Sequence, residues 1–231
     1  MVHPEHQRRA YLQAMGIDIW LPRDAAEQES ESPNQHPAEA VHAPADELDW
    51  SELRACVAAC VRCELSQSRT NTVFGVGNPD ADWMIIGEAP GAEEDRRGEP
   101  FVGRAGKLLD QMLFAIGHSR DSVFIANILK CRPPDNRDPK PDETAACRDY
   151  LERQIALIKP KIILAVGRIA AQTLLASDEP VGRMRGRQHD LDGIPLVVTY
   201  HPAYLLRSPS QKRKSWSDLC LATRLAAEAI T

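Results

Sequence analysis

Four cysteines occur as two pairs whose spacing could gather four thiolates around a metal. Cys60 and Cys63 form a C-x2-C pair, while Cys131 lies in a polar loop and Cys147 on the helix expected after it. Four thiolates suit either a structural zinc ion or a 4Fe-4S cluster, and the spacing alone does not choose between them. Cys56 lies one helical turn before Cys60 and could compete as a ligand, although free cysteines are more often small buried side chains.

Three polar segments follow apolar runs at points where a strand is expected to end. They are Gly87 to Gly91 (sequence GEAPG), Asn127, and His201 before a proline. A side-chain amide both donates and accepts hydrogen bonds, a carboxylate such as Glu88 can orient a water molecule, and an imidazole can stabilise a developing negative charge. Because the carboxyl ends of parallel strands meet at one edge of a sheet, we expect these residues to converge on one crevice.

Alternating strands and helices must position these segments. Continuous apolar runs predict strands within residues 83–90, 122–128, 161–167 and 195–206, the last of which enters a loop. Apolar residues at helical spacing predict helices over 49–65, 103–117, 144–158, 168–177 and 216–230. This alternation is typical of the α/β class, so we predict a three-layer α/β/α domain around a central, mostly parallel four-stranded sheet.

The acidity of the chain is concentrated at its N-terminus. Residues 1–50 contain ten acidic and three basic side chains, whereas the whole chain has a net charge of −5, so the remainder is slightly basic. We therefore divide the chain into an extension, residues 1–47, and a globular domain, residues 48–231. The extension combines a short candidate helix with an acidic, Pro- and Ser-containing stretch that reads as a disordered linker. Its helix either packs on the domain or binds a partner, such as a repair or replication protein.

No apolar run is long enough to cross a membrane, and the N-terminus lacks the features of a signal peptide. We therefore expect a cytoplasmic monomer with no membrane partner. Cysteines in that compartment stay reduced, which favours metal binding over disulfides.

Several motifs together resemble a known family. They are GEAPG at 87–91 followed by AEED, HPAYLLR at 201–207, Asn127 shortly before KCRPP, Phe101 within EPFVGRAG, and the four paired cysteines. This combination resembles family 4, the iron–sulfur branch of the uracil-DNA glycosylase superfamily, over roughly residues 50–225. The resemblance, rather than the spacing, favours a 4Fe-4S cluster that staples the fold.

The resemblance implies an enzyme that extrudes uracil from single- or double-stranded DNA and hydrolyses its N-glycosidic bond, initiating base excision repair. Phe101 would stack on the base, and Asn127 would donate to its O4 and accept from its N3–H. His201 would stabilise the negative charge of the departing uracil near O2. Glu94 would lie near the C5 edge, where it could exclude the methyl group of thymine.

The carboxylate that directs the water is left open by the sequence. Glu88 is the first choice by motif position, and Glu94 and Asp95 are the other nearby acids. Ala89 stands where the best-known branch of the superfamily has an aspartate, so that role cannot be carried over. Gly87, Ala89 and Gly91 would line the base pocket. The two glycines let the backbone approach a ligand closely.

The HPAYLLR segment also suggests contacts to DNA. Leu205 or Leu206 could enter the base stack as an apolar wedge, unless both anchor the segment to the core. Arg207 and neighbouring basic runs could contact phosphates, although charge runs are more often solvated faces. Two other functions stay open: a protein that binds uracil-DNA without turnover, and a zinc-stapled nucleic-acid-binding domain with a vestigial site.

Overall fold

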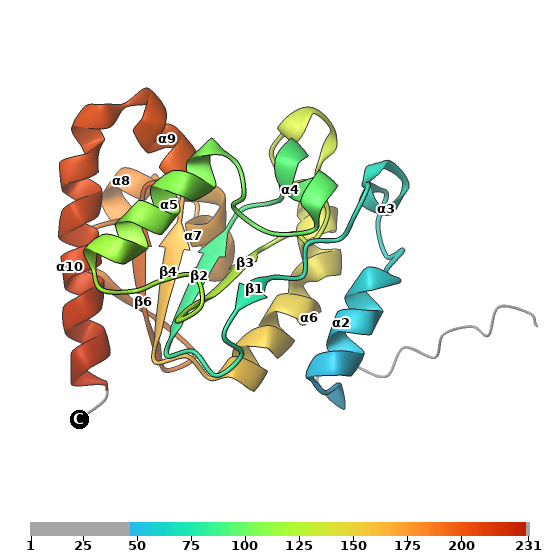
Figure 1. Cartoon of the computed structure of the whole chain (residues 1–231), viewed down its shortest axis with the longest axis horizontal. Helices are drawn as coiled ribbons and strands as arrows, with labels where there is room; N and C mark the ends of the chain where they lie inside the picture. The colour runs from blue at the N-terminus through green and yellow to red at the C-terminus, as the bar shows by residue number, and fades with distance from the viewer. Residues whose placement is uncertain (1–46, 230–231) are drawn as a thin grey trace, which may run out of the picture. The chain divides into compact units, whose positions relative to one another are not determined.

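The computed structural model describes residues 47–229, and its centre is a six-stranded mixed sheet (Figure 1). The N-terminal extension predicted above, apart from Glu47, lies outside the described residues. The strand order is β1-β3-β2-β4-β6-β5. The strands are β1 (Val76–Gly77), β2 (Trp83–Gly87), β3 (Phe124–Asn127), β4 (Ile162–Val166), β5 (Gln188–Leu191) and β6 (Ile194–Thr199).

The prediction of a four-stranded sheet was wrong, because an antiparallel strand lies at each edge of the four parallel strands. β1 has only two residues, too few for a recognisable apolar pattern. β5 has the polar sequence QHDL and is partly exposed, so burial left no signal in it. The turn between β5 and β6 did carry a sequence signal, the dipeptide Asp192-Gly193. Both residues have positive φ, as a tight hairpin turn requires.

Helices cover both faces of the sheet and give the predicted three layers (Figure 1). One core packs helices α2, α6 and α7 against side chains such as Met84 and Ile86. The other packs α5, α9 and α10 against Trp83 and Ile85, which alternate with the first two along β2. The helices of the described residues are α2 (Trp50–Ala58), α3 (Leu65–Ser68), α4 (Ala92–Arg97), α5 (Arg104–Ala115), α6 (Pro141–Ile158), α7 (Arg168–Leu174), α8 (Val181–Met184), α9 (Pro202–Arg207) and α10 (Lys212–Glu228), with 3-10 turns η3 (Pro134–Asn136) and η4 (Pro209–Gln211). None of these helices is long and apolar enough to span a membrane.

Two segments differ from the helices that the sequence predicted. The helix expected over 49–65 begins with a capping box of Asp49 and Glu52 but ends at Ala58, so the chain turns through Cys60 and Cys63 before α3. The segment after β6, expected to be a loop, forms α9 with Pro202 at its first position, where a missing N–H costs nothing. Both departures occur beside the residues proposed for chemistry.

Candidate active site

A cleft of about 780 Å³ opens at the carboxyl ends of the parallel strands. Every sequence-predicted catalytic or base-contacting residue except Gly87 lines it directly. Its predicted lining residues are Glu88, Ala89, Gly91, Glu94, Phe101, Asn127, His201 and Arg207. A more apolar cavity of about 460 Å³ lies beside α6, but it contains none of the residues predicted for chemistry.

Asn127 forms the floor of the cleft. It pairs in register with Gly87 on the adjacent strand, and only 2% of its surface is exposed. Its Oδ1 atom is buried and has no hydrogen-bond partner among residues 47–229. A Cβ atom at Gly87 would lie 2.4 Å from that oxygen and 2.6 Å from the ring of Phe101, so only glycine lets both side chains meet there.

Phe101 and His201 form a stacked pair over this floor. Their ring centroids lie 5.6 Å apart with an interplanar angle of 29°. Phe101 has a φ of 54°, in the left-handed region that a bulky side chain rarely adopts. Such a conformation persists only where the surroundings hold it.

The imidazole of His201 is neutral and has a defined tautomer. Its Nδ1 accepts a hydrogen bond of 3.1 Å from the backbone N–H of Ala203 at the start of α9, so the proton resides on Nε2. Burial and, to a smaller extent, the positive charge of Arg207 lower the pKa of His201 to about 4, and Glu94 opposes the shift. His201 can therefore donate one hydrogen bond from Nε2 at neutral pH.

Glu88 follows β2, and the charges of Arg168 and Asp138 act on its carboxyl group. Burial raises the pKa of its carboxyl, Asp138 adds to the shift, and Arg168 opposes it. Arg168, on the first turn of α7, donates to Asp138 at 2.5 Å. Asp138 thus shares the charge of Arg168 with Glu88, so neither carboxylate neutralises it alone.

The other two nearby acids are already engaged by backbone N–H groups. Glu94 Oε1 accepts from Val102 at 3.0 Å and from Gly103 at 3.1 Å, which fixes the entry to α5. Asp95 is 4% exposed, accepts from Thr70 at 2.9 Å, and does not line the cleft. Glu88 is therefore the only one of the three without such an anchor among the described residues.

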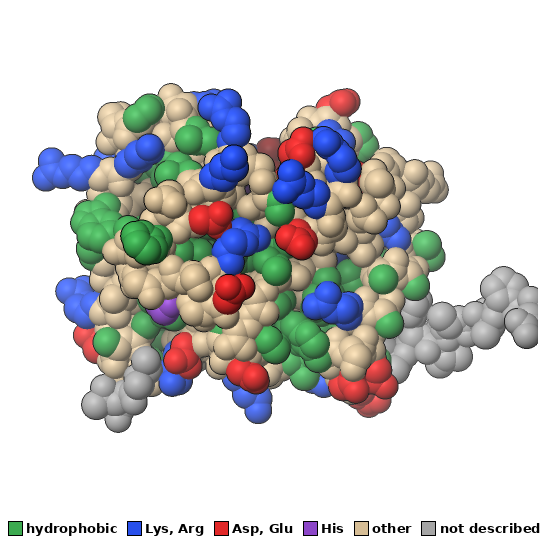
Figure 2. Space-filling view, in the orientation of Figure 1, with side chains coloured by type: hydrophobic (Ala, Val, Ile, Leu, Met, Phe, Trp, Pro, Cys, Tyr) green, Lys and Arg blue, Asp and Glu red, His purple; other side chains and the backbone are tan. Residues whose placement is uncertain are grey.

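The structure separates the two leucines proposed as a wedge. Leu205 is 1% exposed and packs in the core with α5 and α10. Leu206 is 36% exposed and lines a shallow cavity together with Arg104 and Arg207. Figure 2 shows Lys and Arg side chains gathered along the upper edge of this face, over α9 and over the loop after β3.

Some residues of the cleft were not predicted from the sequence. Asn136 lines it from the loop between Cys131 and Cys147, and Arg132 Nε donates to its Oδ1 at 2.8 Å. Arg168 follows a strand-end glycine, a position from which it could have been proposed. The pairing of Arg168 with Asp138, 30 residues away, is visible only in three dimensions.

The four paired cysteines line one small cavity of about 10 Å³. Arg69 Nη1 donates to Cys131 Sγ at 3.1 Å, and the backbone N–H of Lys130 donates to Cys147 Sγ at 3.3 Å. Cys56 lies apart from the cavity lining, with its sulfur 3.8 Å from the hydroxyl of Tyr150.

Within residues 47–229, no group of three or more His, Cys, Asp or Glu side chains is placed so that it could hold a metal ion. The four thiols nevertheless line one cavity, and Arg69 and the backbone of Lys130 donate to two of their sulfurs. Four such thiolates are a donor set that suits a metal centre, either a zinc ion or an iron–sulfur cluster.

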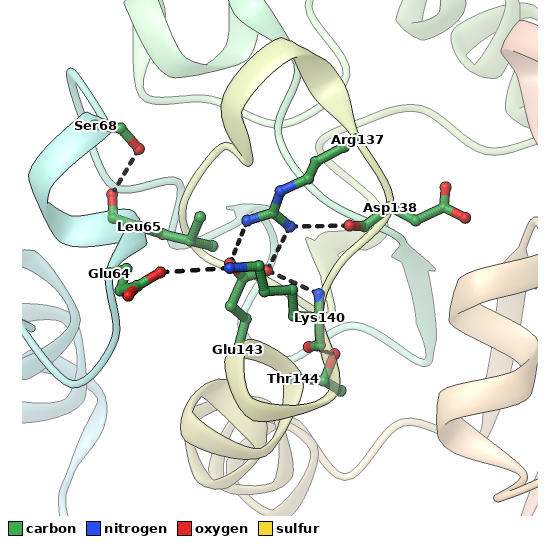
Figure 3. Close-up of polar contacts among 8 residues, drawn as sticks. All are labelled: Glu64, Leu65, Ser68, Arg137, Asp138, Lys140, Glu143 and Thr144. Atoms are coloured by element: carbon green, nitrogen blue, oxygen red, sulfur yellow. Dashed lines mark hydrogen bonds and ion pairs between the residues drawn. The ribbon is translucent and has the colours of Figure 1, made fainter.

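Ion pairs fix the loop between Cys131 and Cys147 (Figure 3). The guanidinium of Arg137 forks onto the buried carboxylate of Glu143, at 2.5 and 2.9 Å, and also donates to the backbone oxygen of Asp138. This contact with Arg137 is the main reason that the pKa of Glu143 is lowered. Lys140 Nζ reaches Glu64 beside α3 at 3.4 Å, which ties the loop to the segment after Cys63.

One buried lysine connects the cysteine cavity with the cleft. Lys130 is 1% exposed, and its Nζ donates to the backbone oxygen of Asn127 at 2.9 Å and to Gln154 Oε1 at 2.6 Å. Gln154 in turn donates to the backbone oxygen of Phe74 at 2.9 Å. These buried hydrogen bonds therefore fix the backbone at the end of β3, where Asn127 lies.

Comparison with known proteins agrees with this geometry. The family model described as the uracil DNA glycosylase superfamily matches residues 74–222. The chain is 43% identical over 170 residues to the type-4 uracil-DNA glycosylase of Archaeoglobus fulgidus, covering 70% of this chain and 85% of that protein. It is 46% identical over 171 residues to the type-4 enzyme of Sulfurisphaera tokodaii (70% and 78% covered), and 40% identical over 185 residues to that of Pyrobaculum aerophilum (75% and 93% covered).

The fold and the cleft are thus those of the uracil DNA glycosylase superfamily. Because the family model covers more than half of the chain and the relatives are matched over most of their length, the chain belongs to the type-4 branch of that superfamily. The resemblance inferred from the motifs is confirmed.

The state of His201 predicts a pH dependence of stability. Its pKa of about 4 lies below the ordinary value of 6.5, so between these values the folded protein binds fewer protons than the unfolded chain. The free energy of unfolding should therefore decrease as the pH falls from 6.5 to 4. This decrease should be roughly 2–3 kcal/mol larger in the wild type than in His201→Gln. Urea unfolding of both proteins across this range measures the difference, and parallel pH profiles would contradict a buried neutral imidazole.

Proposed function

We propose that this chain is a monofunctional uracil-DNA glycosylase that flips uracil out of DNA and hydrolyses its N-glycosidic bond, initiating base excision repair. The observation that carries the proposal is the buried, unpaired Oδ1 of Asn127 at the floor of a cleft that also contains Phe101 and His201. A buried polar atom without a partner is costly unless a ligand completes it. The type-4 relatives, which are uracil-DNA glycosylases by name, support the same activity.

Asn127 gives the site its preference for uracil. Its Oδ1 accepts from N3–H of the base while its Nδ2 donates to O4. Cytosine offers an acceptor at N3 and a donor at C4, so it would leave both groups of the amide unpaired. Phe101 stacks on the ring, and Glu94, fixed by Val102 and Gly103, lies beside the C5 edge.

His201 stabilises the departing base. As the glycosidic bond breaks, negative charge develops on uracil near O2, and Nε2–H of the neutral imidazole donates a hydrogen bond to it. The donor is already oriented by the bond from Ala203 to Nδ1, so little reorganisation is needed during the reaction. Arg207, whose charge is felt at His201, adds positive potential on the same side.

Glu88 orients the attacking water and offsets the positive charge that develops on the sugar. Its carboxyl is the acid of the cleft that no backbone N–H anchors, which favours it over Glu94. Because Ala89 stands where the best-known branch has an aspartate, we assign the orientation of the water to Glu88. Among the described residues no lysine lines the cleft, which agrees with hydrolysis rather than attack by an amine.

DNA binding uses the exposed part of α9. Leu206 is the leucine that reaches solvent, so we assign it as the wedge that fills the space of the extruded base. Leu205 supports it from the core. Arg207, with Arg104 beside it, contacts the backbone phosphates.

Cys60, Cys63, Cys131 and Cys147 would hold a 4Fe-4S cluster. The group supplies a structural cross-link there and no step of the hydrolysis. Arg69 and the backbone of Lys130 donate to its thiolates. The loop between Cys131 and Cys147 would then be held at both ends, with Asn136 and Asp138 kept beside the cleft.

Removal of the two base-contacting polar groups should abolish most of the activity. We expect Asn127→Ala and His201→Ala each to lower the rate of uracil release by about 10²–10³-fold, since each removes an oriented group from the transition state. Release of free uracil from a uracil-containing oligonucleotide, quantified by chromatography, measures this. Wild-type rates in both variants would rule out the proposed mechanism.

The cluster has its own test. Protein purified without oxygen should be brown, absorb broadly near about 400 nm and contain about four irons per chain. Cys147→Ser should lose the absorbance and unfold at a lower temperature than the wild type. Cys220 is an exposed cysteine of α10, so Cys220→Ser should keep the absorbance and the wild-type unfolding temperature. A colourless wild-type protein that contains zinc would contradict the assignment.

A further inference from the structure

Phe101 is held in an unfavourable backbone conformation by one arginine from another part of the chain. Its φ of 54° places a bulky aromatic residue in the left-handed region. Arg120, in the turn between α5 and β3, donates from Nη1 to the backbone oxygen of Phe101 at 3.2 Å. Its Nη2 donates to the backbone oxygen of Pro100 at 2.7 Å. Two consecutive carbonyl groups are thereby fixed by one rigid planar fork.

The helix beside this turn is adapted to the same conformation. A Cβ atom at Gly106 would lie 1.6 Å from the backbone oxygen of Phe101, so the close approach requires glycine at this position of α5. Asp110, one turn further along α5, pairs with Arg120 Nη1 at 3.1 Å. The side chains of Arg120 and Asp110 are 24% and 39% exposed, so the fork is partly shielded from water.

The backbone conformation determines where the ring of Phe101 lies. The ring is 6% exposed, rests over Gly87 and is stacked with His201. A relaxed φ at Phe101 would swing the ring away from both. Because Arg120 does not line the cleft, its effect on the base must pass through Phe101.

We propose that Arg120 is a positioning residue for base recognition, which clamps Phe101 in its left-handed conformation and so presents the ring to uracil. This inference rests on the proposed function of Phe101 as the stacking platform. It adds a residue that lies in none of the recognised motifs and does not touch the substrate.

A double-mutant cycle separates positioning from general structural support. Arg120→Met and Phe101→Ala should each slow single-turnover uracil release by about 10–100-fold, and the double variant should be within about threefold of Phe101→Ala alone. Asp110→Asn, which leaves the bonds to the two carbonyls in place, should change the rate by less than about threefold. Affinity for DNA that contains an abasic site should be the same in Arg120→Met and wild type, because no base is present to stack.

Other outcomes would overturn the inference in distinguishable ways. If the penalties of Arg120→Met and Phe101→Ala multiply, or if Arg120→Met matches the wild type, Arg120 does not act through Phe101. If Phe101→Ala itself releases uracil at the wild-type rate, the stacking function fails and the inference with it. Should Arg120→Met unfold, Arg120→Lys replaces it, because lysine keeps a donor for one carbonyl. Arg120→Lys should show a smaller loss of the rate of uracil release, and this loss should disappear in the Phe101→Ala background. A loss that persists in that background would also overturn the inference.

Discussion

The structure depends on keeping one amide oxygen buried and unpaired. Asn127 Oδ1 is buried at the cleft and accepts no hydrogen bond from any described residue, which leaves it available to a ligand. The surrounding fold sustains it: the parallel pairing of β2 and β3 sets Asn127 beside Gly87, whose missing Cβ leaves the space. Lys130 Nζ donates a hydrogen bond to the backbone oxygen of Asn127 and so fixes its backbone. In the proposed function, N3–H of a flipped uracil is the donor that this oxygen would accept from.

The electrostatics of the cleft follow from burial rather than from strong ion pairing. Burial keeps His201 neutral and raises the pKa of Glu88, so a hydrogen-bond donor and a carboxyl group follow two different strands, β6 and β2, without forming an ion pair. The ion pair of Arg168 and Asp138 moderates the charge near Glu88 and links α7 to the loop that follows Cys131. The cysteine cavity and the cleft therefore share one structural segment.

The sequence predicted those parts of the molecule that leave a local pattern. Four apolar runs predicted the four parallel strands and, through their ends, the residues that the structure gathers in the cleft. The edge strand β5 was missed because it is polar and half-exposed, although its Asp192-Gly193 turn was readable. The sequence could not show that Leu205 is buried and Leu206 exposed, because the segment was predicted to be a loop. Only a helix with a known orientation distinguishes the side chains that face the core from those that face solvent. Contacts such as Arg120 with Phe101 join residues far apart in sequence and carry no motif, so only the fold reveals them.

The central claim is that this cleft hydrolyses uracil from DNA. The most direct measurement compares two labelled oligonucleotides that differ only by uracil or cytosine at one position, incubated with anaerobically purified wild-type protein. The account predicts strand scission at uracil only after alkali treatment, and none at cytosine, because an abasic site forms without lyase activity. Absence of scission at uracil from folded protein, or equal scission at cytosine, would contradict it.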